Sequence, residues 1–376
     1  MSERGAYRSD RPDGRFASTA GLVHAMTKDV EPVLRWDPAM PAEEIPAWQE
    51  AVRAKLLELL RFPEVPEQPE PRMISSEPRD GYELQRWEAY PEPHSVVPFL
   101  VLVPDNIPTP APAVLCFPGS SRTNTGLAGE PEPESTDPHW DENRMALHYA
   151  RAGMVAIAVE NPCMGGRKTE RDANRSEVSM QLLWLGRSYE GLSVFEKLPI
   201  LQWARSQPYI DNTRIATSGH SLGAKPALLL AVLEPEIAAV VWSDFTCDDR
   251  ERSIAIDLSW IAVWQYVPDF LTWFDYPDLM AAIAPRPLLI TEGGRTMHIE
   301  RIREAFRAQG VEDRFCVTYY PKYADPADRP HDGEPLPEGL TMDEFLADWA
   351  NVDVPAHSFK PAVAVPWLAE VLGAGE

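Results

Sequence analysis

The chain has 376 residues with ordinary hydrophobic (44%) and charged (25%) fractions, enough apolar material for one large globular core. Its formal net charge of −23 repels phosphate backbones and anionic lipid headgroups, so nucleic-acid and membrane partners are not expected. None of the four cysteines forms a C-x-x-C pair, the N-terminus has no apolar signal segment, and no apolar run reaches the roughly 18 residues of a bilayer-spanning helix. A cytoplasmic protein is therefore expected.

The first 80 residues are expected to form a helical and irregular extension. Within residues 41–62, apolar side chains recur at a spacing near 3.6 residues, which predicts an amphipathic helix. The chain between 63 and 80 is rich in Pro and Glu and is expected to be a connection.

Residues 81–376 alternate between strand and helix patterns, which predicts a single α/β domain with a mainly parallel central sheet and helices on both faces. In such sheets, ligands bind at the carboxyl ends of the strands, so functional residues should follow the apolar runs. Strands are predicted at 82–90, 96–104, 111–119, 154–162, 213–221, 237–245, 286–294 and 314–323. Helices are predicted at 187–206, 222–234, 297–309 and 361–373.

A G-x-S-x-G pentapeptide, Gly219 to Gly223, lies between a predicted strand and a predicted helix. This strand–turn–helix context is typical of a nucleophile elbow, in which a tight turn lifts the serine hydroxyl above the sheet. We therefore expect Ser221 to be a nucleophile. The adjacent His220 is too close in the chain to act as its base and is expected to line the substrate pocket.

An acyl-transfer site also needs backbone donors for an oxyanion. The N–H of Leu222, directly after the nucleophile, is the first expected donor. The loop after the 111–117 strand is the expected source of the second, because Gly119 allows close backbone approach and Ser120 offers an N–H.

The general base should be a histidine that follows the last strand, because the chain order with such an elbow is Ser, acid, His. His331 and His357 are the two histidines after residue 323. His357 directly precedes the last predicted helix, whereas His331 lies in a polar, Pro-rich stretch. We therefore expect His357 to be the base.

Three carboxylates compete for the role of the acid. Asp244 ends the predicted strand at 237–245 and is ranked first, followed by Asp248 in the same loop. Glu292 is ranked third, because the loop after the 286–294 strand carries no Asp at the usual position. A structural ion pair is an equally good explanation for each of them.

Residues 246–285 are rich in aromatic side chains and are expected to form a helical cap over the active edge. Trp264 and Trp273 are expected to line the pocket, and Arg167, after Gly165 and Gly166, could face an anionic substrate. The other aromatic residues of this segment are Trp260, Tyr266, Phe270, Phe274 and Tyr276. No Gly-rich phosphate loop and no metal-ligand spacing of histidines is present, so neither cofactor nor metal is expected.

The segments FPGSS, ENPCMGGR, GHSLGA, SDFTCDDRER, APRPLLITEGG and NVDVPAHSFKPAVAVPWL resemble the α/β-hydrolase superfamily. More narrowly, residues 85–373 look like its acetylxylan-esterase-like and dienelactone-hydrolase-like branch. The related glucuronoyl esterases place their acid after the strand that follows the nucleophile helix, which fits Asp244. They carry a Cys-Ser-Arg motif at the elbow, where this chain has His-Ser-Leu-Gly, and dienelactone hydrolases use Cys in place of Ser.

The resemblance implies hydrolysis of a carboxylic ester: an acetylated or uronate sugar ester, or another small ester. An amidase, a peptidase or a C–C bond hydrolase could use the same residues. A non-catalytic ligand-binding protein is a further alternative, because the Asp expected after the 286–294 strand is missing. The expected partner is a small-molecule ester, and a homodimer is compatible with the aromatic cap.

Overall fold

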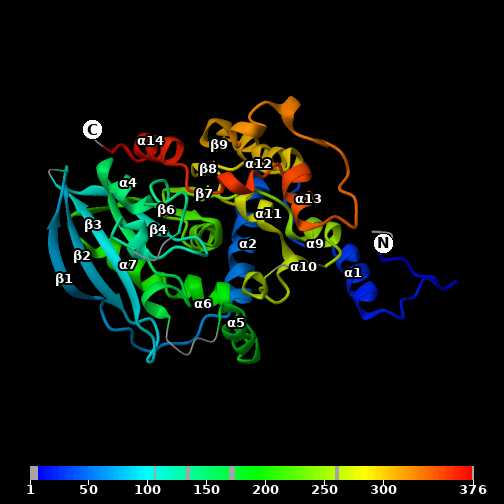
Figure 1. The fold of residues 1–376 in the computed structure, drawn as a ribbon, viewed down its shortest axis with the longest axis horizontal. Coiled ribbons are helices and arrows are strands. Elements are labelled where there is room, and N and C mark those ends of the chain that lie inside the picture. The colour runs from blue at the N-terminus through cyan, green and yellow to red at the C-terminus, as the bar shows by residue number, and fades with distance from the viewer. Residues whose placement is uncertain (1–6, 106, 133–135, 169–173, 259–261, 375–376) are drawn as a thin grey trace.

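The computed structural model describes residues 7–105, 107–132, 136–168, 174–258 and 262–374. A nine-stranded sheet runs through it in the order β1-β2-β3-β5-β4-β6-β7-β8-β9 (Figure 1). The pairs β1–β2, β2–β3 and β3–β5 are antiparallel. All pairs from β5 onward in this order, through β4, β6, β7 and β8 to β9, are parallel. This arrangement confirms the predicted α/β class with a mainly parallel sheet.

Every predicted strand forms, and one strand was not predicted. The bounds are β1 Arg72–Arg79, β2 Tyr82–Ala89, β3 Val97–Pro104, β4 Ala111–Phe117, β5 Val155–Val159, β6 Ile210–His220, β7 Ala239–Ser243, β8 Leu288–Ile290 and β9 Phe315–Val317. The unpredicted strand, β1, lies within the expected connection at 63–80. It is an edge strand whose side chains are largely exposed, so it carries no apolar alternation that a sequence pattern could reveal.

Alternate residues of the buried strands enter two separate cores. On β4, Leu115 and Phe117 join the larger core, while Val114 and Cys116 join the smaller one on the opposite face. The larger core is covered by α2 Ile45–Leu60, α7 Leu198–Ser206, α8 Ala224–Leu233, α11 Tyr276–Ala281 and α12 Thr296–Ala308. The smaller core is covered by α4 Met145–Arg151 and α14 Pro361–Leu372. Helices therefore cover both faces, as predicted.

The N-terminal segment is part of the larger core. The helix predicted at 41–62 is α2, and its buried face packs into the same cluster as α8 and α11. Ahead of it, the buried Trp36 donates its backbone N–H to Asp278 at 2.9 Å. The side chain of Arg250 donates its Nε–H to the carbonyl of Thr27 at the end of α1 (Thr19–Asp29). Trp36 and α2 therefore pack against the same core as the central sheet.

Short helices fill the connection between β7 and β8. They are α9 Asp249–Ala255, α10 Phe270–Trp273 and α11. Figure 1 shows them on the α1 side of the sheet. The remaining helices are α3 Asn124–Leu127, α5 Arg175–Trp184, α6 Tyr189–Phe195 and α13 Met342–Glu344. No helix in the part of the chain that the structure describes is long and apolar enough to cross a bilayer.

Candidate active site

The turn between β6 and α8 places Ser221 at the carboxyl edge of the sheet. Ser221 itself has φ 51°, in the left-handed region. A Cβ on Gly219 would lie 2.0 Å from the carbonyl oxygen of Gly223, and a Cβ on Gly223 would lie 2.2 Å from that of Phe117. Only glycine fits at these two positions, so the structure confirms the tight strand–turn–helix that the pentapeptide predicts.

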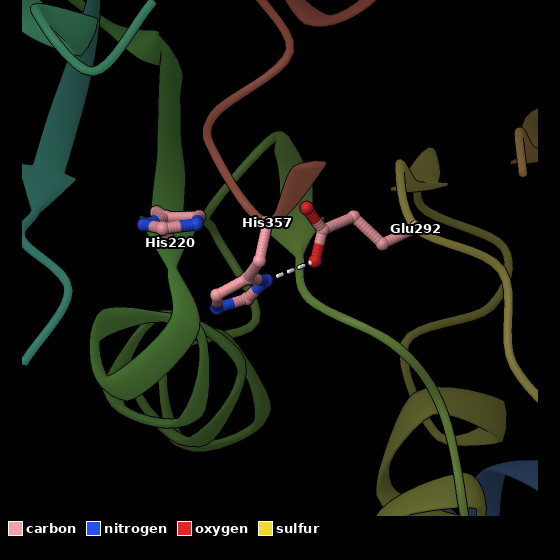
Figure 2. A group of neighbouring side chains, drawn as sticks. All are labelled: His220, Glu292 and His357. Carbon is pink, nitrogen blue, oxygen red and sulfur yellow. Dashed lines mark hydrogen bonds and ion pairs between the residues drawn. The ribbon is translucent and has the colours of Figure 1, made fainter. Parts of the chain in front are cut away.

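His357 is held by a buried carboxylate, that of Glu292. The Nδ1–H of His357 donates to Glu292 Oε2 at 2.7 Å, as Figure 2 shows. The other oxygen, Oε1, accepts the backbone N–H of Ser358 at 3.3 Å and pairs with Lys360 Nζ at 3.1 Å. Glu292 is fully buried, so its charged form is stabilised there by these three partners.

The electrostatics of the pair favour the charged form of both groups. Burial alone would raise the pKa of Glu292, but the hydrogen bond and the charge of His357 outweigh it and lower that pKa to about 2. Burial would lower the pKa of His357, but the bond to Glu292 outweighs it and raises that pKa above its ordinary value. An imidazolium at His357 is therefore stabilised, as a general base requires.

The order of the three acid candidates is corrected by this geometry. Asp244, ranked first, accepts the N–H of the next residue, Phe245, at 2.8 Å, and burial raises its pKa to about 6. Among the described residues, no hydrogen bond joins Asp244 to His357. Glu292 takes that place because it lies two residues after the end of β8, the neighbour of β7 in the sheet, at the usual position for the acid on this fold.

Asp248, ranked second, belongs to a structural cluster. It caps α9 by accepting the N–H of Glu251 at 3.0 Å, and its own N–H donates to His298 Nδ1 at 3.1 Å. His298 Nε2 bonds Glu251 Oε2 at 3.1 Å, and Arg301 lies 3.7 Å from Asp248 Oδ2. This network ties α9 to α12, so the ion-pair alternative for Asp248 is the correct one.

Two glycines after Glu292 let the chain turn beneath the site. Gly293 and Gly294 have φ values of 61° and 136°. A Cβ on Gly294 would lie 2.0 Å from the carbonyl oxygen of Thr246. Thr246 N–H donates to Gly293 O at 2.8 Å, and Arg295 N–H donates to Thr246 O at 3.2 Å. The loop after β7 is therefore hydrogen-bonded to the loop that carries Glu292, which fixes the backbone of the acid.

His220 lies beside His357, with ring centroids 4.6 Å apart (Figure 2). Its side chain is 4% exposed, and neither ring nitrogen has a hydrogen-bond partner among the described residues. Burial and the neighbouring His357 hold the pKa of His220 well below its ordinary value, so it is neutral. A Cβ on Gly119 would lie 2.8 Å from His220 Nδ1, so this imidazole packs directly on the loop after β4.

Two cavities meet at Ser221. One, of about 810 Å³, is lined by Gly119 and His220; the other, of about 280 Å³, is lined by Leu222 and Asp244. The residues common to both are Ser120, Ser221, Val354 and His357. The predicted nucleophile, base and oxyanion loop therefore lie together, at the junction of the cavities.

Of the two tryptophans predicted to line the pocket, one does and the other does not. Trp264 lines the smaller cavity, as expected. Trp273 lines neither: its Nε1–H donates to Asp269 Oδ2 at 3.0 Å and its ring lies 3.9 Å from Lys55 Nζ, so its assignment to the pocket is wrong. Trp260 lies outside the described residues.

Arg167 is also placed elsewhere. Its guanidinium forms a bidentate pair with Glu196 at 2.5 and 2.6 Å, and it lines a separate cavity of about 370 Å³ with His94 and Ser95. The glycines before it do follow β5, but the chain then turns Arg167 toward α6. Its assignment to the substrate pocket is therefore corrected. His331 is exposed, stacks on Trp349 and pairs with Glu334, so it lies outside the site as expected.

Several contacts around the site were not predicted. Tyr320 Oη lies 3.4 Å from His357 Nδ1, and His139 Nε2 bonds the carbonyl of Pro355 at 2.7 Å in the loop before His357. Arg175 donates to the carbonyl of Ser120 at 3.1 Å, and its guanidinium lies 4.9 Å from the Trp264 ring centroid. The signal for Lys360 was present in the sequence, since it lies three residues after His357. Tyr320, His139 and Arg175 come from distant segments.

Two groups of described side chains have the ligand types and spacing of a metal site. One is His220, Glu292 and His357, and the other is Asp248, Glu251 and His298. The His357–Glu292 bond occupies two ligands of the first group, and the hydrogen bonds of His298 occupy both its nitrogens in the second. In the first group, His220 contacts His357 only through its ring, with centroids 4.6 Å apart.

Comparisons with known proteins give a consistent result. The model of the Abhydrolase family matches residues 3–370. A Bacteroides fragilis protein provisionally named an acetyl xylan esterase is 37% identical, with a TM-score of 0.92 over 97% of this chain and 98% of that one. A Bacillus subtilis protein named as the hydrolase YtaP is 25% identical over 60% of this chain and 73% of its own length. A glucuronoyl esterase from Solibacter usitatus, 13% identical over 75% of this chain and 87% of its own, has a TM-score of 0.53 and shares the fold.

Proposed function

Because the chain belongs to the Abhydrolase family, we propose that it is a serine esterase with Ser221, His357 and Glu292 as its catalytic triad. The family match confirms the resemblance described from the sequence motifs and the expected class, a carboxylic ester hydrolase. The observation that carries the triad is the 2.7 Å bond between His357 Nδ1 and the buried Glu292, beside a serine on a nucleophile elbow.

The expected substrates are acylated sugars, because the 37% identical relative bears the name of an acetyl xylan esterase. The larger cavity supports this class. Arg122, Glu132, Asp137 and His139 line it, and such polar side chains suit the hydroxyl groups of a sugar. Its volume of about 810 Å³ also leaves room for an alcohol much larger than a methyl or ethyl group.

In the proposed reaction, Glu292 occupies Nδ1 of His357 and leaves Nε2 to act on Ser221. The hydroxyl oxygen of Ser221 attacks the ester carbonyl while Nε2 takes its proton, and Glu292 stabilises the resulting imidazolium. His357 then returns the proton to the leaving alcohol. Water, deprotonated by the same nitrogen, releases the acyl group from Ser221.

The oxyanion that forms in each step would be held by backbone donors. We assign these to the N–H of Leu222 and to the loop at Gly119 and Ser120, which line the cavities beside Ser221. Arg175 donates a hydrogen bond to the carbonyl of Ser120, which helps to hold this loop in place. Preorganised donors of this kind are worth about 10²- to 10³-fold in kcat each.

Two measurements test the proposal. The protein should hydrolyse p-nitrophenyl acetate and butyrate, and a fluorophosphonate should form one adduct, on the peptide that contains Ser221, as mass spectrometry would show. Heat-denatured protein is the control and should not react. An active protein labelled at another serine would contradict the triad. No turnover and no adduct would favour the ligand-binding alternative, and cleavage of only the matching p-nitroanilides would favour an amidase.

The pH dependence follows from the pKa of His357. The base works only when neutral, so kcat/KM should rise with pH through an apparent pKa above 6.5. In Glu292→Gln the interactions of Glu292 that raise the pKa of His357 are lost while its burial remains, so this pKa should fall below the wild-type value. Titration of the His357 ring by NMR measures this even where turnover is too slow. Equal pKa values in the two proteins would show that the pair does not act on the base.

A further inference from the structure

The smaller cavity contains two cations among aromatic rings. Lys225, at the start of α8, and Arg252, on α9, both line it and are 8% and 9% exposed. Lys225 Nζ lies 4.3 Å from the ring centroid of Tyr276. The aromatic lining residues are Trp242, Phe245, Trp264 and Tyr276. The reaction proposed above gives these two cations no role.

These cations carry more donors than the protein satisfies. Lys225 Nζ bonds Asp249 Oδ2 at 3.3 Å and Gln265 Oε1 at 3.2 Å. Arg252 bonds the other oxygen of Asp249 at 3.0 Å and the same Gln265 oxygen at 3.3 Å. Arg252 Nε is buried and has no acceptor among the described residues. An ammonium and a guanidinium together carry more N–H groups than one carboxylate and one amide oxygen can accept.

The smaller cavity therefore has two cations in its wall, although the protein as a whole is strongly acidic. Asp249 neutralises one of the two cations that it bridges. Glu190 interacts electrostatically with Lys225, and burial raises its pKa to about 7, so it carries only part of a negative charge at neutral pH. Asp244 also lines the cavity, and burial raises its pKa to about 6. A carboxylate of a ligand would accept hydrogen bonds from N–H groups of Lys225 and Arg252 that Asp249 and Gln265 leave without an acceptor.

The size of this cavity excludes an acetyl group as its full occupant. Its volume is about 280 Å³, whereas a methyl group takes up about as much room as a water molecule, ~30 Å³. The acyl group stays on Ser221 after the alcohol has left, so the narrower cavity suits the acyl half. The larger cavity suits the bulky alcohol and its departure.

Resting on the proposed esterase function, we infer that the smaller cavity binds an acyl group that ends in a carboxylate, paired with Lys225 and Arg252. Hemiesters of short dicarboxylic acids, such as succinyl and glutaryl esters, have this chemistry. Hydrolysis would break the ester C–O bond, return the proton from His357 to the alcohol, and use one water to release the dicarboxylate from Ser221.

The test compares mono-p-nitrophenyl glutarate with p-nitrophenyl butyrate at about 0.15 M salt, which screens the negative field of the whole protein. Wild type should prefer the glutarate monoester at least tenfold in kcat/KM. Arg252→Gln and Lys225→Gln should each lower this preference at least tenfold, mainly through KM. The matched control is Arg307→Gln, an exposed arginine paired with Glu312, which should leave both substrates unchanged.

The outcomes separate this inference from the proposed function. Hydrolysis of butyrate without a preference for the glutarate monoester, or a preference that both variants keep, would overturn the inference and leave the esterase intact. Two variants guard against misfolding of one, and their thermal unfolding is measured alongside. If neither ester is cleaved, calorimetry with glutarate tests the cavity without turnover. Binding that is lost in Arg252→Gln supports the site, and no binding by wild type overturns it.

Discussion

Replacing Ser221 by Ala is expected to lower kcat/KM for p-nitrophenyl butyrate by about 10⁴-fold or more. The change removes the attacking oxygen and nothing else from the site. Since Ser221 already lies at φ 51°, Ala meets the same backbone strain as Ser, and the fold should persist. Turnover and the melting temperature measured on the same preparation would check both halves of this expectation.

Ser218→Ala is the matched control on the same strand. Ser218 is buried on β6 and its hydroxyl bonds Tyr149 Oη at 2.9 Å, on the face of the sheet covered by α4. Its loss should cost about 1 kcal/mol of folding free energy and leave kcat/KM unchanged well below the melting temperature. Turnover by Ser221→Ala within tenfold of wild type would rule out Ser221 as the nucleophile.

Glu292→Gln is expected to lower kcat by about 10³- to 10⁴-fold. The amide has nearly the shape of the carboxylate but carries no charge, so it does not stabilise the imidazolium of His357. It also leaves Lys360, 3.1 Å away, without its anionic partner, so some loss of stability should accompany the loss of rate. Circular dichroism separates the two effects.

Asp244→Asn tests the alternative acid. Asp244 accepts a hydrogen bond from its own neighbour and influences His357 only through its charge, so this variant should stay within about tenfold of wild type. The opposite pattern, with Asp244→Asn inactive and Glu292→Gln active, would show that the catalytic complex uses a different arrangement of the His357 loop.

The sequence predicted the sheet well because the parallel strands are buried on both faces. Apolar runs such as 111–117 and 154–162 can be recognised without knowledge of their neighbours. The pentapeptide predicted the tight turn at Ser221, and the position of His357 before the last helix led to the proposal that it is the base; both line the same two cavities. The strand β1 was missed because it is exposed, and its pairing with β2 depends on tertiary contacts.

The carboxylate that bonds His357 could not be predicted because residue type and strand position gave opposite answers. Asp244 has the expected residue type and ends a buried strand, whereas Glu292 has the expected position but a longer side chain. Which of them reaches His357 depends on the turn at Gly293 and Gly294 and on its hydrogen bonds to Thr246. These are contacts between separate segments, which spacing along the chain does not encode.

The pocket residues show the same limit. Aromatic density predicted that the 246–285 segment would contribute to the site, and Trp264 does. The same density could not tell Trp264 from Trp273, which packs against α2 through Lys55. Arg167 follows a strand end as expected, but its charge is already paired with Glu196. In both cases a partner from a distant helix decides where the side chain lies.

Because two cavities meet at Ser221, protein engineering could change the selectivity for the acyl group and the selectivity for the alcohol separately. Apart from the reacting residues, their common walls are Ser120 and Val354, so most lining positions affect one half alone. Mutant libraries at Trp264, Gln265 and Arg252 would alter selectivity for the acyl group. Libraries at Arg122 and His139 would alter selectivity for the alcohol. The two sets of residues would contact different parts of the substrate. The effects of improved variants from each set on kcat/KM should therefore be nearly additive.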